Sequence, residues 1–132
     1  MSSRVPFFDL KRQYVKLRVD IDAAFKAVFE RTAFSGGEFV EIFDKEFAKF
    51  CGVKYSRSLN SGTAAIHLAL LALGIKVGDE VIVPANTFIA SAWGVSYTGA
   101  KPVFVDCLPD TWEIDPIAVE SAITKKTRAI IA

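Results

Sequence analysis

The tripeptide Ser61-Gly62-Thr63 has the residue types of an anion-binding loop. It lies between 55–59, a short segment that we predict to be a strand, and 64–73, an apolar run typical of a buried helix. The first N–H groups of a helix lack partners within it and carry partial positive charge, so a phosphate can bind there. Gly62 would let an anion approach the backbone, and both hydroxyls could donate hydrogen bonds. Because Ser and Thr are also ordinary N-cap residues, a purely structural cap stays open at this point.

Other common kinds of site are not indicated. The tripeptide is not followed by the Gly-Lys-Ser/Thr of a Walker loop, and the further glycines of a dinucleotide fingerprint are absent. His67 is the one histidine, so we expect neither an ordinary zinc site nor a Ser-His-Asp triad. Cys51 and Cys107 lack metal-like spacing and are interpreted as free thiols. The sequence therefore predicts no metal site.

Phe88 is a second candidate ligand contact. It follows Thr87 shortly after a predicted strand that ends at Pro84, where the carboxyl end of a strand should open toward a ligand. A ring at that point can stack on a planar cofactor, and a core phenylalanine at a helix start is the alternative. Asp106 also ends a strand and is favoured as a turn former, while His67 is favoured as a core histidine hydrogen-bonded to the backbone.

Helix-like and strand-like segments alternate along the chain. Apolar residues at helical spacing predict two helices before the candidate loop, the first of them capped by Asp9, and Asp115-Pro116 is a strong helix start. Short branched apolar strands, each followed by a helix, predict parallel βαβ units and hence an α/β fold with a mostly parallel sheet. The predicted helices after the loop are 64–73, 88–97 and 116–123, and the later predicted strands are 80–83, 102–105 and 128–132.

Composition narrows the class of protein. Of 132 residues, 52% are apolar and 11 are Phe, which excludes intrinsic disorder and leaves apolar surface for another chain or a further part of this one. The net charge is +1 without basic runs, so we expect no nucleic-acid partner, and no apolar run is long enough for a membrane segment. We expect a cytoplasmic protein. The chain stops within a predicted strand, which favours a fragment of a longer chain over a complete small protein.

Seven motifs follow one another in a recognisable order along the chain. They are Phe7-Phe8-Asp9-Leu10, the segment from Ser35 to Ala48, Asn60 to Ala65, Gly78 to Pro84, Thr87-Phe88, Gly99 to Asp106, and Ile114-Asp115-Pro116. Taken together, they resemble the DegT/DnrJ/EryC1/StrS aminotransferase family. The resemblance covers essentially the whole chain, and Asp44 stands where the family usually has Glu.

The resemblance implies an incomplete large domain of a fold-type-I transferase that uses pyridoxal 5′-phosphate. Residues 1–36 would form an N-terminal helical arm and residues 37–132 the first part of the cofactor-binding domain. Ser61, Gly62 and Thr63 would hold the cofactor phosphate, and Phe88 would stack on its ring. The family implies a homodimer that transfers an amino group, usually from glutamate, to a nucleotide-linked keto sugar in amino-sugar biosynthesis.

The resemblance also implies which residues are not in this chain. The Schiff-base lysine of the family and the acidic partner of the pyridine nitrogen lie further downstream, so no catalytic residue is assigned here, and Lys125 and Lys126 precede a strand on the wrong edge of the sheet. Two alternatives stay open. One is an enzyme of the same fold that acts on a non-nucleotide substrate or dehydrates sugars. The other is a non-catalytic fragment that binds a phosphorylated ligand or serves as a pairing partner.

Overall fold

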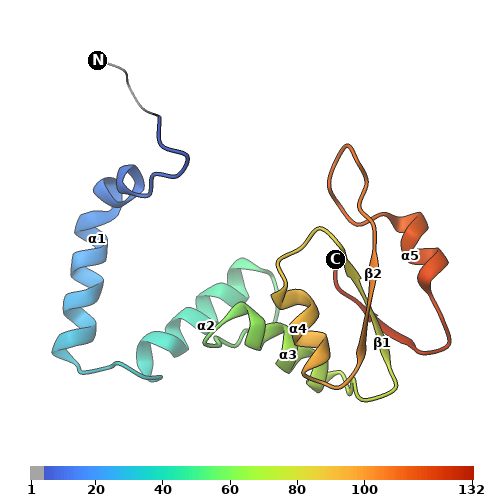
Figure 1. Ribbon diagram of the computed structural model, residues 1–132. Coiled ribbons are helices and arrows are strands. Elements are labelled where there is room, and N and C mark those ends of the chain that lie inside the picture. Colours follow the sequence, from blue (N-terminus) through green and yellow to red (C-terminus); the bar gives the residue numbers. More distant parts are fainter. Residues whose placement is uncertain (1–4) are drawn as a thin grey trace. The chain divides into compact units, whose positions relative to one another are not determined.

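The computed structural model describes residues 5–132, which divide into two compact units after Ser58. The first unit holds α1 (Lys11–Glu30) and α2 (Glu38–Phe50) (Figure 1). The predicted boundary between a helical arm and the cofactor-binding domain, after residue 36, falls inside the first unit and stays a prediction. The second unit contains α3 (Gly62–Ala72), β1 (Glu80–Pro84), α4 (Ala90–Ser96), β2 (Lys101–Val105), α5 (Pro116–Ala122) and β3 (Thr127–Ile130).

Both helices that the sequence predicts before the candidate loop are present, although the N-cap residue of α1 is Leu10 and not Asp9. The carboxylate of Asp9 accepts a hydrogen bond from the N–H of Lys11 at 3.0 Å, and α2 follows Gly37, whose φ of 83° suits glycine. The buried positions of α2 are Asp44 and Ala48. A row of phenylalanine rings on this helix, Phe43, Phe47 and Phe50, is exposed instead.

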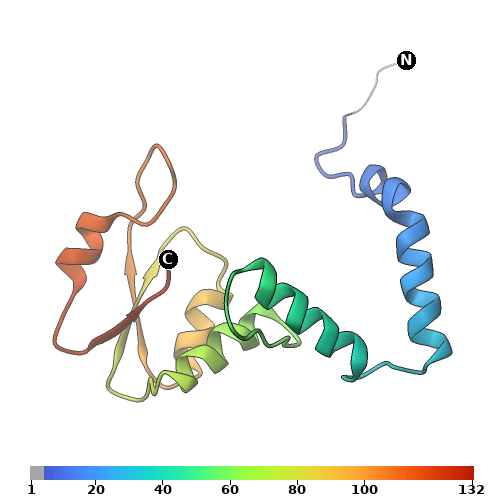
Figure 2. The same cartoon turned by 180° about the vertical axis from the view of Figure 1, so that it is seen from behind.

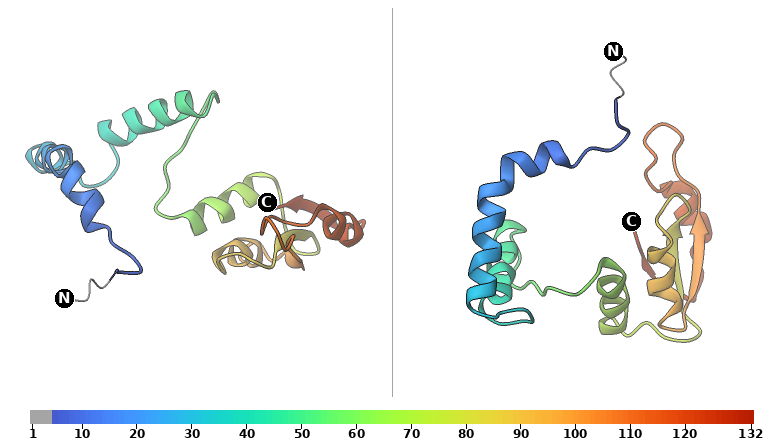
Figure 3. Two further views of the ribbon diagram at one scale, coloured as in Figure 1. Left: turned by 90° about the horizontal axis from the view of Figure 1, so that it is seen from above. Right: turned by 60° about the vertical axis from the view of Figure 1, so that its left-hand side comes forward.

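The second unit is built on a three-stranded parallel sheet with strand order β2-β1-β3. The chain therefore steps from β1 to one neighbour and then crosses back over β1 to the other. Right-handed crossovers in these two directions place their helices on opposite faces of the sheet. Accordingly, α3 and α4 lie on one side and α5 on the other (Figures 1, 2 and 3). The predicted α/β class and parallel strands are confirmed.

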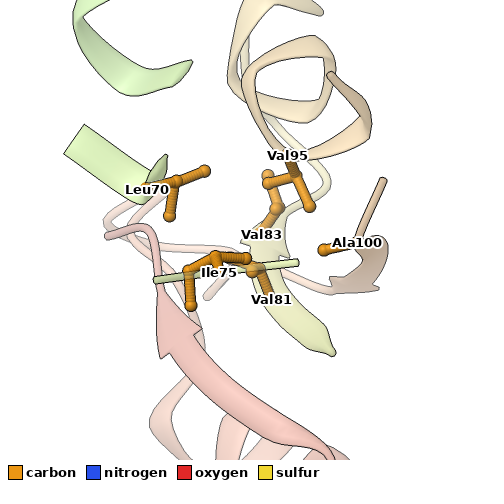
Figure 4. Packing of buried hydrophobic residues seen from close by; sticks show 6 residues of the cluster. All are labelled: Leu70, Ile75, Val81, Val83, Val95 and Ala100. Atoms are coloured by element: carbon orange, nitrogen blue, oxygen red, sulfur yellow. The ribbon is translucent and has the colours of Figure 1, made fainter. Parts of the chain in front are cut away.

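The core lies between the sheet and the helix pair α3 and α4. Val81 and Val83 of β1 point toward Leu70 of α3 and Val95 of α4, and these side chains form one cluster (Figure 4). Ile82, the alternate residue of β1, faces the opposite side and is also fully buried. The central strand is therefore buried on both faces, which explains its unbroken apolar sequence.

Two predicted elements differ from the structure. The strand predicted over 55–59 is wrong, since that segment pairs with no strand among the described residues. The helix predicted from residue 88 begins at Ala90, so Phe88 precedes it. Asp115 caps α5 as predicted and accepts from the N–H of Ile117 at 2.8 Å. Across residues 5–132, no helix has the length and apolarity needed to cross a membrane.

Candidate functional site

The start of α3 combines a hydroxyl cap with unused backbone donors. Ser61 is extended, with φ −162° and ψ 158°, and its Oγ accepts a hydrogen bond from the N–H of Ala64 at 3.1 Å. Its carbonyl accepts from the N–H of Ala65 at 3.0 Å. The N–H groups of Gly62 and Thr63 belong to the first turn of α3, where no helical carbonyl can accept from them. A neutral cap thus leaves two adjacent donors for an anion.

Gly62 is not required by the local backbone. Its φ lies outside the left-handed region, and no heavy atom lies within 4 Å of the place where a Cβ would stand. Folding of this turn therefore does not explain why the smallest residue is here. Without a side chain at this position, the backbone of the first turn stays open to an approaching anion.

The packing of α3 against α4 fixes where this turn lies. A Cβ at Gly94 of α4 would stand 2.5 Å from Cγ2 of Ile66, so the two helices approach closely at this glycine. One residue beyond Ile66, His67 packs edge-on against the ring of Tyr97 at 5.5 Å. Both helices run toward the amino ends of the strands, α3 leading into β1 and α4 into β2 (Figure 1). Their first turns therefore point toward the carboxyl edge of the sheet, where parallel sheets bind ligands.

Phe88 lies in the connection from β1 to α4 and is 75% exposed. Within residues 5–132 Phe88 is therefore not a core residue, and its contact with a cofactor ring stays a prediction. Two hydrogen bonds hold the connection on either side of it. The N–H of Ala85 donates to the carbonyl of Val105 at 2.8 Å, and the hydroxyls of Thr87 and Ser91 lie 2.9 Å apart. The ring is thus presented on an anchored loop at the carboxyl end of β1.

A hollow of about 500 Å³ opens beside this loop. It lies between the carboxyl ends of β1 and β3, and Thr87, Ser91, Trp112 and Glu113 are among its lining residues. In the sequence, Trp112 carries no sign of a site residue and Glu113 is typical of an ordinary loop charge. Their position in the loop that leaves the carboxyl end of β2 is the signal that could have found them.

The remaining candidate residues make contacts within the fold. Asp106 lies between β2 and the bridge at Cys107, where its Oδ1 accepts from the N–H of Cys107 at 2.8 Å and its carbonyl accepts from the N–H of Asp115 at 3.1 Å. His67 is half-buried and packs on Tyr97, and its side chain makes no hydrogen bond to the backbone of the described residues, so that prediction is wrong. Lys126 is exposed at the amino edge of the sheet, where its carbonyl accepts from the N–H of Glu80, and Lys125 is exposed next to it. These two lysines therefore lie at the edge of the sheet away from the candidate site.

Comparison with known proteins defines the class to which this fold and site belong. The sequence pattern of the DegT/DnrJ/EryC1/StrS aminotransferase family matches residues 15–132. The chain therefore belongs to this family, and the predicted family is confirmed.

Individual relatives agree with this assignment. The chain is 48% identical over 128 residues to dTDP-3-amino-3,4,6-trideoxy-alpha-D-glucose transaminase of Streptomyces venezuelae, and 53% identical over 97 residues to GDP-perosamine synthase of Caulobacter vibrioides. These alignments cover 97% and 74% of this chain but 34% and 26% of the relatives. The chain thus spans between a quarter and about a third of the length of these two proteins.

Solved structures show the same fold. The crystal structure of Streptomyces venezuelae DesV with a ketimine intermediate matches with a TM-score of 0.92 at 47% identity, over 98% of this chain and 35% of that one. The structure of NtdA from Bacillus subtilis with bound cofactor PMP matches with a TM-score of 0.87 at 38% identity, over 98% of this chain and 30% of that one. The predicted fold, part of the large domain of a PLP aminotransferase, is confirmed.

Proposed function

We propose that this chain is part of a pyridoxal-phosphate-dependent aminotransferase that aminates a nucleotide-linked keto sugar, with glutamate as the amino donor, in amino-sugar biosynthesis. The observation that carries the proposal is the open first turn of α3 within a chain of this family. Its relatives include transaminases or synthases named for dTDP-, GDP- and UDP-linked sugars.

The cofactor would bind through its phosphate at the start of α3. The N–H groups of Gly62 and Thr63 would donate to the phosphate oxygens, and the hydroxyls of Ser61 and Thr63 would add further donors. Phe88 would cover one face of the pyridine ring, for which its exposure leaves room. Bound there, the coenzyme supplies an electron sink for the transfer of an amino group.

The lysine that binds the coenzyme covalently would come from a segment outside this chain. The described structure supports this assignment, because Lys125 and Lys126 are at the amino edge of the sheet, whereas the candidate cradle is at the carboxyl edge. The role of residues 59–132 would then be to bind and orient the cofactor, and the proton transfers would depend on groups supplied elsewhere.

The proposal includes a homodimer in the cytoplasm. Apolar rings on α2, above all Phe43, Phe47 and Phe50, are 53%, 45% and 86% exposed in this chain. Exposed apolar surface of this kind is usually covered by protein. A second subunit together with the remainder of the polypeptide would cover it.

The test uses the intact gene product with added pyridoxal phosphate. We expect a visible absorbance band and, after reduction with borohydride, a lysine that carries the cofactor in the peptide map, at a position outside residues 1–132. Amino transfer to a panel of nucleotide keto sugars should then be measured with glutamate as donor. A colourless protein without a labelled lysine would overturn the enzyme proposal and favour a non-catalytic ligand-binding or pairing role.

A second candidate function keeps the fold and changes the substrate. The crystal structure of 3-amino-5-hydroxybenzoic acid synthase matches with a TM-score of 0.70 at 41% identity, over 71% of this chain and 24% of that one. An enzyme of the same fold that acts on a non-nucleotide ring, or that dehydrates a sugar, therefore fits the same cradle. Cofactor binding with no amino transfer to any nucleotide keto sugar would favour this second function.

A further inference from the structure

The loop between β2 and α5 holds a bulky residue in a strained backbone conformation. Trp112 has a φ of 62°, in the left-handed region that large side chains rarely adopt. Its N–H donates to the carbonyl of Leu108 at 2.9 Å, and the N–H of Leu108 donates to the carbonyl of Glu113 at 2.8 Å. An isolated antiparallel bridge pairs Cys107 with Ile114 at the base of the loop. The loop is thus closed upon itself and holds Trp112 in place despite the strain.

The strained residue Trp112 lines the hollow at the carboxyl edge of the sheet. The indole of Trp112 is 69% exposed and contributes to the wall of the 500 Å³ hollow that Thr87, Ser91 and Glu113 also line. A glycine at this position would relieve the strain and remove the ring. The loop therefore holds an aromatic surface beside two hydroxyls and a carboxylate, at the edge where the cofactor ring is proposed to lie.

An aromatic face next to polar side chains suits a particular kind of ligand. The C–H face of a sugar ring packs on an indole, while the hydroxyls of the sugar need hydrogen-bond partners such as a carboxylate or a serine. We propose that Trp112 is a specificity-determining residue that packs on the sugar ring of the substrate, with Glu113 and Ser91 as hydroxyl partners. This inference rests on the proposed function, because it takes the substrate to be a nucleotide-linked sugar.

The experiment compares two ligands in the intact gene product loaded with pyridoxal phosphate. The probes are dTDP alone and a dTDP-linked amino sugar, and their affinities are measured for the wild-type protein, Trp112→Gly and Trp112→Phe. We expect Trp112→Gly to bind the dTDP-linked amino sugar about ten-fold more weakly, with unchanged affinity for dTDP. Trp112→Phe should recover most of that loss. In amino transfer, KM for the keto sugar should rise in Trp112→Gly with little change in kcat.

A structural role for Trp112 would give a different result. If another part of the polypeptide covers the indole, Trp112→Gly will lower the thermal midpoint and weaken the affinity for both probes equally. Alternatively, the affinities for both probes will stay unchanged. Either result would overturn the inference. Failure of the proposed function would look different, because it would be seen in the wild-type protein. That protein would then retain no cofactor, or it would bind neither the nucleotide nor the nucleotide-linked sugar in the dTDP, GDP and UDP series.

Discussion

Two helices of the second unit start with similar sequence signals and offer different chemistry. At α3, Ser61 caps the helix through the N–H of Ala64 and leaves the N–H groups of Gly62 and Thr63 available. At α5, the carboxylate of Asp115 accepts from the N–H of the second helical residue at 2.8 Å. The first helical residue of α5 is proline, which has no N–H to donate.

The difference shows that a good helix cap need not leave room for an anion. The carboxylate at α5 already supplies the negative charge that the helix dipole favours, and it would repel a phosphate. The neutral hydroxyl at α3 stabilises the helix start and does not neutralise the partial positive charge of the helix N-terminus. The charge of the cap and the number of free N–H groups therefore separate the two sites, although Ser and Asp are equally common caps.

The largest expected effect comes from giving α3 the cap of α5. Ser61→Asp should keep the helix start intact, because Asp caps as well as Ser. It should weaken binding of pyridoxal phosphate by the intact gene product about 100-fold, since a carboxylate would stand next to the phosphate. Affinities for pyridoxal phosphate and for pyridoxal, which lacks the phosphate, should be measured together.

The matched control reverses the exchange at the other helix. Asp115→Ser should leave the affinity for pyridoxal phosphate unchanged, because α5 is proposed to hold no part of the cofactor. If Ser61→Asp bound pyridoxal phosphate as tightly as the wild-type protein does, the phosphate would lie elsewhere and the assignment of the cradle would be wrong. Pyridoxal should bind both variants equally.

An element of this structure can be predicted from the sequence when it depends only on residues that are neighbours along the chain. The buried strand Val81–Val83 and the cap at Asp115 follow from residue types next to one another, and both were predicted. A strand over 55–59 was predicted from the same kind of pattern and is absent, because a strand also needs a partner and none pairs with it in the described part of the chain. Hydrogen-bonded pairing is not a local property.

The residues of the candidate site also fall into those that the local sequence indicates and those that it does not. Ser61, Gly62 and Thr63 stand out because hydroxyl residues and a glycine come directly before an apolar helix, and this signal holds although the strand predicted before them is absent. Trp112 gave no such signal, since its left-handed backbone depends on the hydrogen bonds that close its loop and not on its own preference. The position of Phe88 after β1 made it a candidate, the resemblance to a family favoured a stacked ring over a core residue, and the structure adds that the residue is exposed.

The second prediction concerns the glycine that lets α3 approach α4. In Gly94→Ala, the new methyl group would lie 2.5 Å from Cγ2 and 3.0 Å from Cβ of Ile66, both on a stiff β-branched side chain. We expect the free energy of unfolding of the intact protein to fall by about 1–3 kcal/mol, as for other overpacked cores. Urea denaturation would measure the change.

The control for Gly94→Ala is the same substitution at the other helical glycine. Gly62→Ala adds its methyl group where nothing lies within 4 Å, so stability should stay level or rise by up to about 1 kcal/mol. At the same time Gly62→Ala should weaken cofactor binding, because the methyl group enters the approach to the free N–H groups. If Gly94→Ala and Gly62→Ala had the same free energy of unfolding, α3 and α4 would have moved apart without loss of stability, and the prediction would be wrong.

The third prediction tests the proposed ring contact. Phe88→Ala should weaken pyridoxal phosphate binding by about ten-fold, through loss of a stacked ring and its buried area. Because Phe88 is 75% exposed in this chain, folding of residues 59–132 should not depend on it. Phe88→Tyr, which keeps a ring, serves as the control and should bind the cofactor nearly as tightly as the wild-type protein does. Unchanged affinity in Phe88→Ala would exclude stacking.

The smallest expected effect returns to α5 and to the meaning of its cap. Asp115→Ala removes the carboxylate that accepts from the N–H of Ile117, so the free energy of unfolding should fall by about 1 kcal/mol. Asp115→Asn keeps an oxygen acceptor without the charge and should remain within a few tenths of a kcal/mol of the wild-type protein. If both variants lost stability equally, the charge and not the hydrogen bond would stabilise α5. The caps of α3 and α5 would then differ also in how they stabilise their helices, α3 through a neutral hydrogen bond and α5 through charge.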